Sequence, residues 1–147
     1  MWGRRVKAAR LNSSRDDVSM DLDQLGEDVL TFLTERHLAT LTSLRADGTP
    51  HVVPVGFSYE PETRLARVIT GGGSVKARLA GRPGAVGALC QVDRARWLTL
   101  SGRLHVETSP EAVDDAVRRY AARYREPRVN PLRVVLVLQV ERLMGHV

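Results

Sequence analysis

The sequence predicts one α+β domain, a mainly antiparallel, six-stranded β-barrel with flanking helices. Three observations predict this class. The 147 residues suffice for one compact domain, strand-like segments follow one another through short turns, and helix signals occur at three places. Strands joined by short turns form antiparallel sheets, whereas parallel strands need a long crossover between them.

The predicted domain covers residues 20–147. Residues 1–19 are basic and polar and lack hydrophobic periodicity. They are therefore predicted to form a disordered tail or an upstream extension, with either Met1 or Met20 as the true start.

An amphipathic helix is predicted to open the domain. Its apolar side chains recur at helical spacing: Leu22, Leu25, Val29, Phe32 and Leu33. Asp21 and Asp23 at its start and Arg36 at its end complement the helix dipole.

Three strands are predicted next, over residues 37–44, 51–59 and 64–70. The pair Asp47-Gly48 between the first two is typical of a tight hairpin turn. The triplet Gly71-Gly72-Gly73 ends the third strand, Ser74 can cap a helix over residues 75–79, and a further strand covers residues 85–92.

The last part of the chain is predicted as strand, helix and strand. Residues 96–107 alternate in polarity, which indicates a half-buried strand with these residues on its inner face: Leu98, Leu100, Gly102, Leu104 and Val106. A second amphipathic helix begins at Thr108 or Ser109, which precede Pro110, and ends at Pro127. Its apolar stripe consists of Val113, Val117, Tyr120 and Tyr124. The final strand covers residues 134–142.

Charge argues weakly for nucleic-acid binding. The net charge is +5, but residues 1–20 hold five basic and two acidic side chains, which leaves +2 for residues 21–147. No aromatic stacking motif accompanies these charges, so no nucleic-acid partner is expected. No apolar run is long enough to span a membrane and no signal sequence is evident, so we expect a cytoplasmic protein without a membrane partner.

The residues offer no self-sufficient catalytic set. Four histidines and one cysteine occur without an HExxH, GxSxG, CxxC or GxxxxGK[ST] pattern. We therefore expect no metal site and no nucleophilic triad.

The segment from Thr70 to Lys76 is the most informative one for function. It leads a strand through three glycines into a helix that begins with a hydroxyl group and carries an ammonium group. Backbone amides, the Ser74 hydroxyl and Lys76 could together bind a phosphate. The residues alone are equally compatible with a plain strand-to-helix connection.

Residues 21–147 resemble the pyridoxamine 5'-phosphate oxidase-like split β-barrel family, and within it the coenzyme F420-dependent reductase branch that includes biliverdin reductases. Besides the order of the elements, four stretches carry the resemblance: FLTERHLATLTSLRADGTPHVVPVGF at 32–57, ARVITGGGSVKA at 66–77, QVDRARWLTLSGR at 91–103 and RYREPRVNPLRVV at 123–135. The resemblance implies the FMN-binding split-barrel fold.

The resemblance also implies a cofactor site for coenzyme F420, with FMN as the alternative. One strand would line the cofactor ring: His51, Val52, Val53, Pro54, Val55 and Gly56. The next turn would hold its phosphate: Thr70, Gly71, Gly72, Ser74 and Lys76. Pro54 lacks a backbone donor that the ring edge could require.

A homodimer with cofactor pockets at the subunit interface is implied as well. Gln91, Arg96 and Trp97 would complete the site together with the second subunit. Arg125, Arg128 and Asn130 lie in a basic loop that would suit the carboxylates of a small-molecule substrate.

The activity that the resemblance implies is hydride transfer from reduced F420 to a conjugated acceptor, with biliverdin reduced to bilirubin. The cofactor supplies the hydride, so no catalytic side chain is assigned. Two alternatives stay open: an FMN-binding oxidase or reductase on the same barrel, and a non-catalytic carrier of F420 or a tetrapyrrole.

Overall fold

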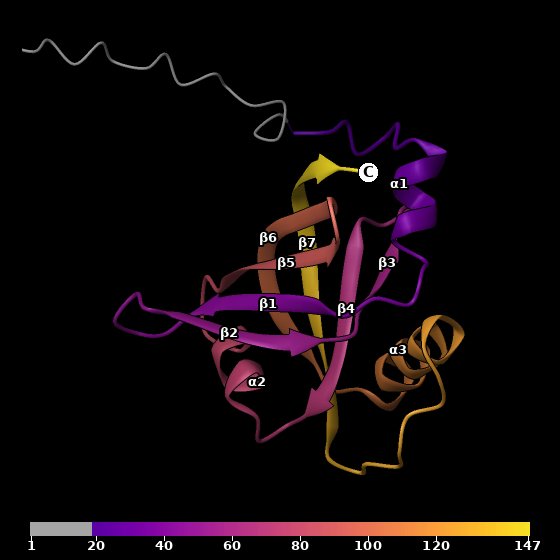
Figure 1. The fold of residues 1–147 in the computed structure, drawn as a ribbon. Coiled ribbons are helices and arrows are strands. Elements are labelled where there is room, and N and C mark those ends of the chain that lie inside the picture. Colours follow the sequence, from indigo (N-terminus) through magenta and orange to yellow (C-terminus); the bar gives the residue numbers. More distant parts are fainter. Residues whose placement is uncertain (1–18) are drawn as a thin grey trace, which may run out of the picture.

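The computed structural model describes residues 19–147, and the predicted tail, apart from Ser19, lies outside them. The elements, shown in Figure 1, are α1 (Glu27–Phe32), β1 (Ala39–Leu44), β2 (Pro50–Val55), β3 (Ser58–Glu60), β4 (Leu65–Gly71), α2 (Val75–Ala80), β5 (Val86–Asp93), β6 (Arg96–Glu107), α3 (Pro110–Arg123) and β7 (Arg133–His146). None of the helices in this part is long and apolar enough to cross a membrane.

All the strands form one antiparallel sheet in the order β2-β1-β5-β6-β7-β4-β3. The two edge strands, β2 and β3, follow each other in the chain, and the sheet curls around one apolar core. The predicted α+β class is therefore confirmed. The predicted count of six strands is wrong, because the single strand expected over residues 51–59 is two strands, β2 and β3.

The break between β2 and β3 falls at Gly56 and Phe57. The amide of Phe57 donates to the Tyr124 hydroxyl at 3.2 Å instead of to a carbonyl of a neighbouring strand. The Phe57 carbonyl accepts a hydrogen bond from Nη1 of Arg123 at 2.7 Å. Side chains at the end of α3 thus take the backbone bonds that a continuous strand would have given to a neighbour.

The first helix is shorter than predicted. Gly26 lies at the N-cap and α1 contains six residues, because the chain before it forms a turn in which the amide of Gln24 donates to the carbonyl of Asp21. Leu22 and Leu25 still pack against the core from this turn. The helical spacing of the apolar residues therefore indicates burial over the whole segment. It coincides with a helix only in the second half of the segment.

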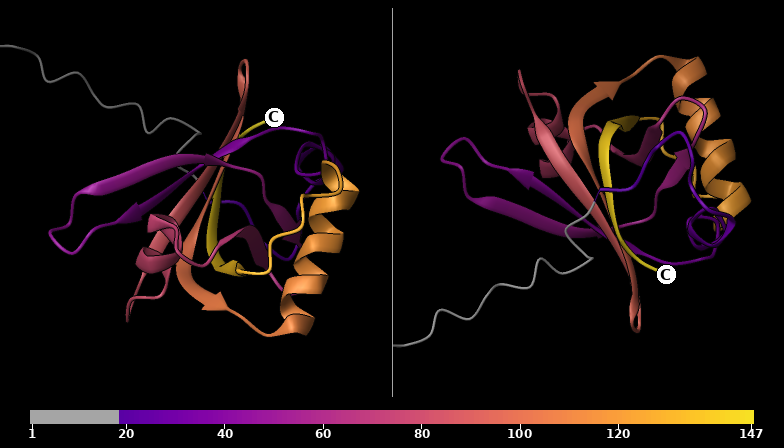
Figure 2. Two further views of the ribbon diagram at one scale, coloured as in Figure 1. Left: turned by 90° about the horizontal axis from the view of Figure 1, so that it is seen from below. Right: turned by 90° about the horizontal axis from the view of Figure 1, so that it is seen from above.

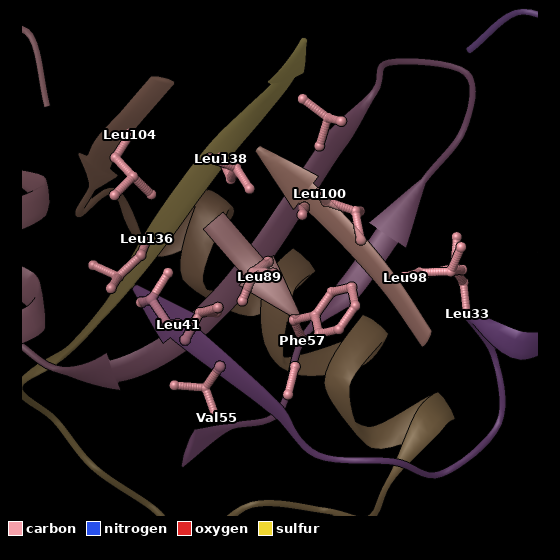
Figure 3. Packing of buried hydrophobic residues seen from close by; sticks show 14 of the residues in the cluster. Leu33, Leu41, Val55, Phe57, Leu89, Leu98, Leu100, Leu104, Leu136 and Leu138 are labelled. Atoms are coloured by element: carbon pink, nitrogen blue, oxygen red, sulfur yellow. The ribbon is translucent and has the colours of Figure 1, made fainter. Parts of the chain in front are cut away.

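The core lies inside the curled sheet, as Figure 3 shows. Its largest fully buried side chains come from many elements: Phe32, Phe57, Leu41, Leu89, Leu98, Leu100, Leu136, Leu138 and Leu143. Strand β7 is apolar on both faces because α3 lies over the outer one (Figure 2). There Val135 and Val137 pack against Ala116. Met20 is joined to this body, since its amide donates to the Leu143 carbonyl at 2.7 Å.

Candidate functional site

A cavity of about 300 Å³ gathers many of the residues expected to bind a ligand. It is lined by Pro54, Val55, Gly56, Ile69, Thr70, Gly71, Lys76, Tyr120, Pro127, Asn130 and Arg133. Seven of the predicted site residues are among them: Pro54, Val55, Gly56, Thr70, Gly71, Lys76 and Asn130. We call this space the anion cavity.

The anion cavity lies between two strand edges that lack a neighbour. β2 pairs only with β1, so its other edge is open. β3 covers β4 only as far as Arg67, which leaves residues 68–71 of β4 without a partner on that side. The cavity takes one wall from the end of β2 and the other from this uncovered part of β4.

Two cations and no carboxylate are found among the described residues that line the anion cavity. Within the described chain, the Lys76 ammonium group makes no hydrogen bond or ion pair. The guanidinium of Arg133 is anchored through Nη2 on the Arg128 carbonyl. Because two like charges face one space without an internal counter-ion, the cavity favours an anion.

The turn before α2 is held by its own hydroxyl groups. Ser74 is the N-cap, and its Oγ accepts hydrogen bonds from the amide of Ala77 and from the Thr70 hydroxyl, each at 3.2 Å. The amide of Gly72 donates to the Leu132 carbonyl at 2.8 Å and is therefore already in use. Ser74 and Thr70 fix the helix that carries Lys76, while Gly72 joins this turn to the loop before β7.

Tyr120 closes the anion cavity from the side of α3, and Gly56 makes its position possible. A Cβ atom at Gly56 would lie 2.9 Å from Cε2 of Tyr120 and 3.1 Å from Cε2 of Tyr124. The two tyrosine rings pack with centroids 4.9 Å apart. Only glycine lets these rings come so close to the end of β2.

The other residues of the predicted ring-lining strand divide between the two faces of β2. Val53 packs against the core and His51 lies on the same inward-facing side, where its Nδ1 is buried without a hydrogen bond in the described chain. Val52 points outward and is 55% exposed. None of the three lines the anion cavity.

Gln91 lies in the core, away from the anion cavity. Its side chain is fully buried, and its Nε2 donates to the Phe32 carbonyl at 2.8 Å while its Oε1 accepts from Nη2 of Arg123. Arg123 also donates to the Glu35 carbonyl at 2.9 Å. Gln91 and Arg123 together therefore fix the end of α1 to the sheet.

Arg96 belongs to a cluster of charges at the other end of the sheet from α2. Its guanidinium donates to the carboxylates of Glu35 and Asp93, and this lowers the pKa of both carboxyls below their ordinary values. The Nε2 atom of His37 lies 2.9 Å from Oε2 of Glu35. Ligand atoms of Glu35, His37 and Asp93 lie within 4.8 Å of one another, but both carboxylates already pair with Arg96.

Trp97 and the two remaining loop arginines also lie outside the anion cavity. Trp97 pairs with Val92 in the register of β5 and β6 and is half-buried. The Arg128 side chain is exposed. Arg125 lines a neighbouring hollow that shares Tyr120 with the anion cavity.

Comparison with known proteins identifies the family of the chain. The sequence model of the pyridoxamine 5'-phosphate oxidase family matches residues 25–146. The chain belongs to the pyridoxamine 5'-phosphate oxidase family. A relative named F420H(2)-dependent biliverdin reductase, from Mycobacterium tuberculosis (strain CDC 1551 / Oshkosh), is 58% identical over 122 residues, which are 83% of this chain and 88% of that protein.

Solved structures share the fold of this oxidase-family chain. A conserved hypothetical protein from Mycobacterium tuberculosis has a TM-score of 0.68 at 18% identity and covers 88% of this chain and 89% of its own. A protein described as an F420 reductase has a TM-score of 0.65 at 20% identity, with coverage of 81% and 98%.

The donor set of the anion cavity fits a phosphate group. Lys76 is unpaired within the described residues, Arg133 is its cationic neighbour, and Asn130 binds the Leu132 amide through Oδ1, which leaves its Nδ2 for another acceptor. Phosphate groups require cations and N–H donors of this kind.

Four residues of the cavity wall were not predicted as site residues from the sequence: Ile69, Tyr120, Pro127 and Arg133. Ile69 could have been found from the strand that leads to Thr70. Arg133 stands at the end of the arginine-rich loop and opposite Gly71 in the register of β4 and β7, which only the pairing reveals. Tyr120 was recognised only as part of the apolar stripe of α3.

Proposed function

We propose that this chain is an F420H2-dependent reductase that transfers a hydride to a conjugated acceptor, with biliverdin as the substrate. The relative that is 58% identical over 122 residues carries that name. The observation of the structure that carries the proposal is the pair Lys76 and Arg133, which face one cavity with no carboxylate among its described lining residues.

Lys76 and Arg133 would bind the cofactor phosphate, and Ser74 and Thr70 would hold Lys76 in place through the cap of α2. The apolar end of β2, at Val55 and its neighbours, would cover part of the ring. When bound, reduced F420 supplies the hydride, and a proton added to the acceptor completes the reduction. The chain's residues would bind and orient the cofactor and the acceptor, and they would exclude water from the site.

A homodimer is part of the proposal, and the outer face of the sheet supports it. Outward-facing apolar side chains from β1, β2 and β5 share this face, and they are largely exposed: Leu44, Val52, Val86 and Val92. Trp97 and Arg103 extend the same face on β6, because they pair with Val92 and Val86. A second subunit would cover this surface and bring its own Gln91, Arg96 and Trp97 region toward the site.

Titration of the purified chain with F420 and, separately, with FMN tests the cofactor. We expect micromolar or tighter binding of F420, weaker binding of FMN, and at least tenfold weaker F420 binding by Lys76→Ala, or about 1.4 kcal/mol. Arg78→Ala is the matched control, because Arg78 lies on the same helix outside the cavity. Tighter binding of FMN would favour the FMN-dependent alternative.

Turnover with biliverdin tests the activity. Oxidation of F420H2 that depends on added biliverdin is expected. Tight F420 binding without hydride transfer to biliverdin or another conjugated acceptor would instead indicate a non-catalytic carrier.

Light scattering on a sizing column tests the homodimer. Val52→Glu and Val86→Glu should shift the chain toward the monomer, because each places a charge on the apolar outer face. Val129→Glu, in a loop where the side chain is 95% exposed, should leave the dimer unchanged. A wild-type chain that elutes as a monomer would contradict this part of the proposal.

A further inference from the structure

Tyr120 on α3 and Tyr124 at its C-cap pack against each other, but the fold uses only one of the two hydroxyl groups. The Tyr124 hydroxyl donates to the His37 carbonyl at 2.7 Å and accepts from the Phe57 amide at 3.2 Å. The Tyr120 hydroxyl makes no hydrogen bond within the described chain. Because the ring centroids are 4.9 Å apart, the fixed Tyr124 ring supports that of Tyr120. The fold therefore holds the Tyr120 ring in place and leaves its hydroxyl group for a ligand.

The Tyr120 hydroxyl lies close to the end of β2, where the proposed function places part of the cofactor ring. Tyr120 lines the anion cavity together with Val55 and Gly56. A Cβ atom at Gly56 would lie 2.9 Å from Cε2 of Tyr120, which is bonded to the carbon that bears the hydroxyl. Hydride transfer requires direct contact between the cofactor ring and the acceptor. An acceptor that contacts a ring at the end of β2 would therefore lie beside the Tyr120 hydroxyl.

The anion cavity offers few other proton donors. No carboxyl, histidine or cysteine is among the described residues that line it. Lys76 and Arg133 are the cations that would bind the cofactor phosphate, and the Thr70 hydroxyl already donates to Ser74. A general acid must lie within hydrogen-bond reach of the atom that it protonates. Of the described residues that line the cavity, Tyr120 is thus the best suited to this role.

We propose that Tyr120 is a catalytic residue, the general acid that protonates the acceptor. This inference rests on the proposed function. The acceptor gains a hydride at carbon, with two electrons from the reduced cofactor, and the negative charge that results at a conjugated nitrogen takes the proton of the Tyr120 hydroxyl. The O–H bond breaks as the N–H bond forms, and the remaining proton of F420H2 is released to water.

The surroundings of Tyr120 favour both halves of this proton transfer. The tyrosinate that forms faces a cavity whose cations are Lys76 and Arg133, with no carboxylate among the described lining residues. Tyr120 also lines the neighbouring hollow, which has a volume of about 390 Å³. Water in that hollow can return a proton to the tyrosinate, so the net transfer to the acceptor is one hydride and one proton.

Tyr120→Phe tests the general acid, because it removes the hydroxyl and keeps the ring that packs on Tyr124. We expect kcat with biliverdin to fall at least tenfold, while the KM for biliverdin and the Kd for F420 change less than twofold. Tyr59→Phe is the matched control. The Tyr59 hydroxyl is also buried without a hydrogen bond in the described chain, but Tyr59 lies outside the anion cavity. This control should reduce biliverdin at the wild-type rate.

The absorption spectrum of bound biliverdin tests the same contact without turnover. Oxidised F420 cannot donate a hydride, so biliverdin bound in its presence stays unreduced. Its visible absorption maximum should differ between the wild type and Tyr120→Phe, because a hydrogen bond to a ring nitrogen changes the transition energy of a conjugated system. Tyr59→Phe should give the wild-type spectrum. A wild-type kcat or an unchanged spectrum in Tyr120→Phe would overturn the assignment.

F420 binding separates this inference from the proposed function. A kcat that falls together with F420 affinity in Tyr120→Phe would make Tyr120 part of the wall that holds the cofactor and would overturn its role as the acid. A wild type that does not bind F420, or that oxidises F420H2 independently of biliverdin, would contradict the proposed function itself.

Discussion

Arg123 donates a hydrogen bond from Nη2 to Oε1 of Gln91, although one residue ends a surface helix and the other is fully buried in the sheet. The same guanidinium stacks over the Phe57 ring, 4.7 Å from its centroid. Burial lowers the pKa of Arg123 from its ordinary value, yet its carbonyl and amide partners satisfy the donors. One side chain therefore joins the segment after α1, the strand break and β5.

Replacing Arg123 should destabilise the fold. Arg123→Met removes the donor to Oε1 of the buried Gln91, and a buried acceptor without a partner is costly, so we expect a loss of at least about 2 kcal/mol. Urea unfolding measures it. Arg118→Gln is the matched control, because Arg118 is exposed on the same helix and pairs with Asp115. Equal stability of the two variants would contradict the role of Arg123.

Gly56→Ala should displace Tyr120 and weaken ligand binding. The new Cβ would lie 2.9 Å from the Tyr120 ring, and Tyr124 is held by its hydroxyl, so Tyr120 must move. We expect a loss of about 1–3 kcal/mol in stability from overpacking and a several-fold rise in the Kd for F420. Gly73→Ala meets no atom within 4 Å and should leave the unfolding free energy nearly unchanged.

The two serine caps should differ in their effect on binding. Ser74→Ala and Ser109→Ala each remove a hydroxyl that accepts from a helix amide, at Ala77 and Ala112 respectively, and each should cost about 1 kcal/mol in stability. Only Ser74→Ala should also weaken F420 binding, because α2 carries Lys76. Paired urea unfolding and fluorescence titrations measure both effects. Equal F420 affinities in the two variants would show that the cap of α2 does not position Lys76.

The stabilising effect of Arg96 should depend on pH. Hydrogen bonds from Arg96 lower the pKa values of Glu35 and Asp93 from ordinary values of 4.5 and 3.8. A lowered carboxyl pKa stabilises the fold above the ordinary value, and this stability is lost as pH falls through the lowered value. Arg96→Met should therefore lower the Tm at pH 7, with a smaller difference from wild type near pH 3. A Tm difference that stays constant over this range would contradict the linkage.

Elements with strong local signals could be predicted well from the sequence. The alternation of residues 96–107 predicts the inner face of β6, and Pro110 after Thr108 or Ser109 predicts the start of α3, where Ser109 is the N-cap. The break after β2 could not be predicted, because the hydrogen bond of the Phe57 amide is accepted by the Tyr124 hydroxyl, 67 residues away in the sequence. The ion pair of Arg96 could not be predicted for the same reason, since only the fold brings its partner Glu35 close to it.

The anion cavity lies where β2 and the end of β4 leave their edges unpaired, and the chain itself has no hydrogen bonds across this gap among the described strands. A ligand that contacts both walls would therefore tie together two edges that are otherwise free to separate. Local opening of the barrel should become rarer when the ligand is bound. We expect slower amide hydrogen exchange at residues 52–55 and 68–71, with smaller changes in β6, whose two edges are already paired.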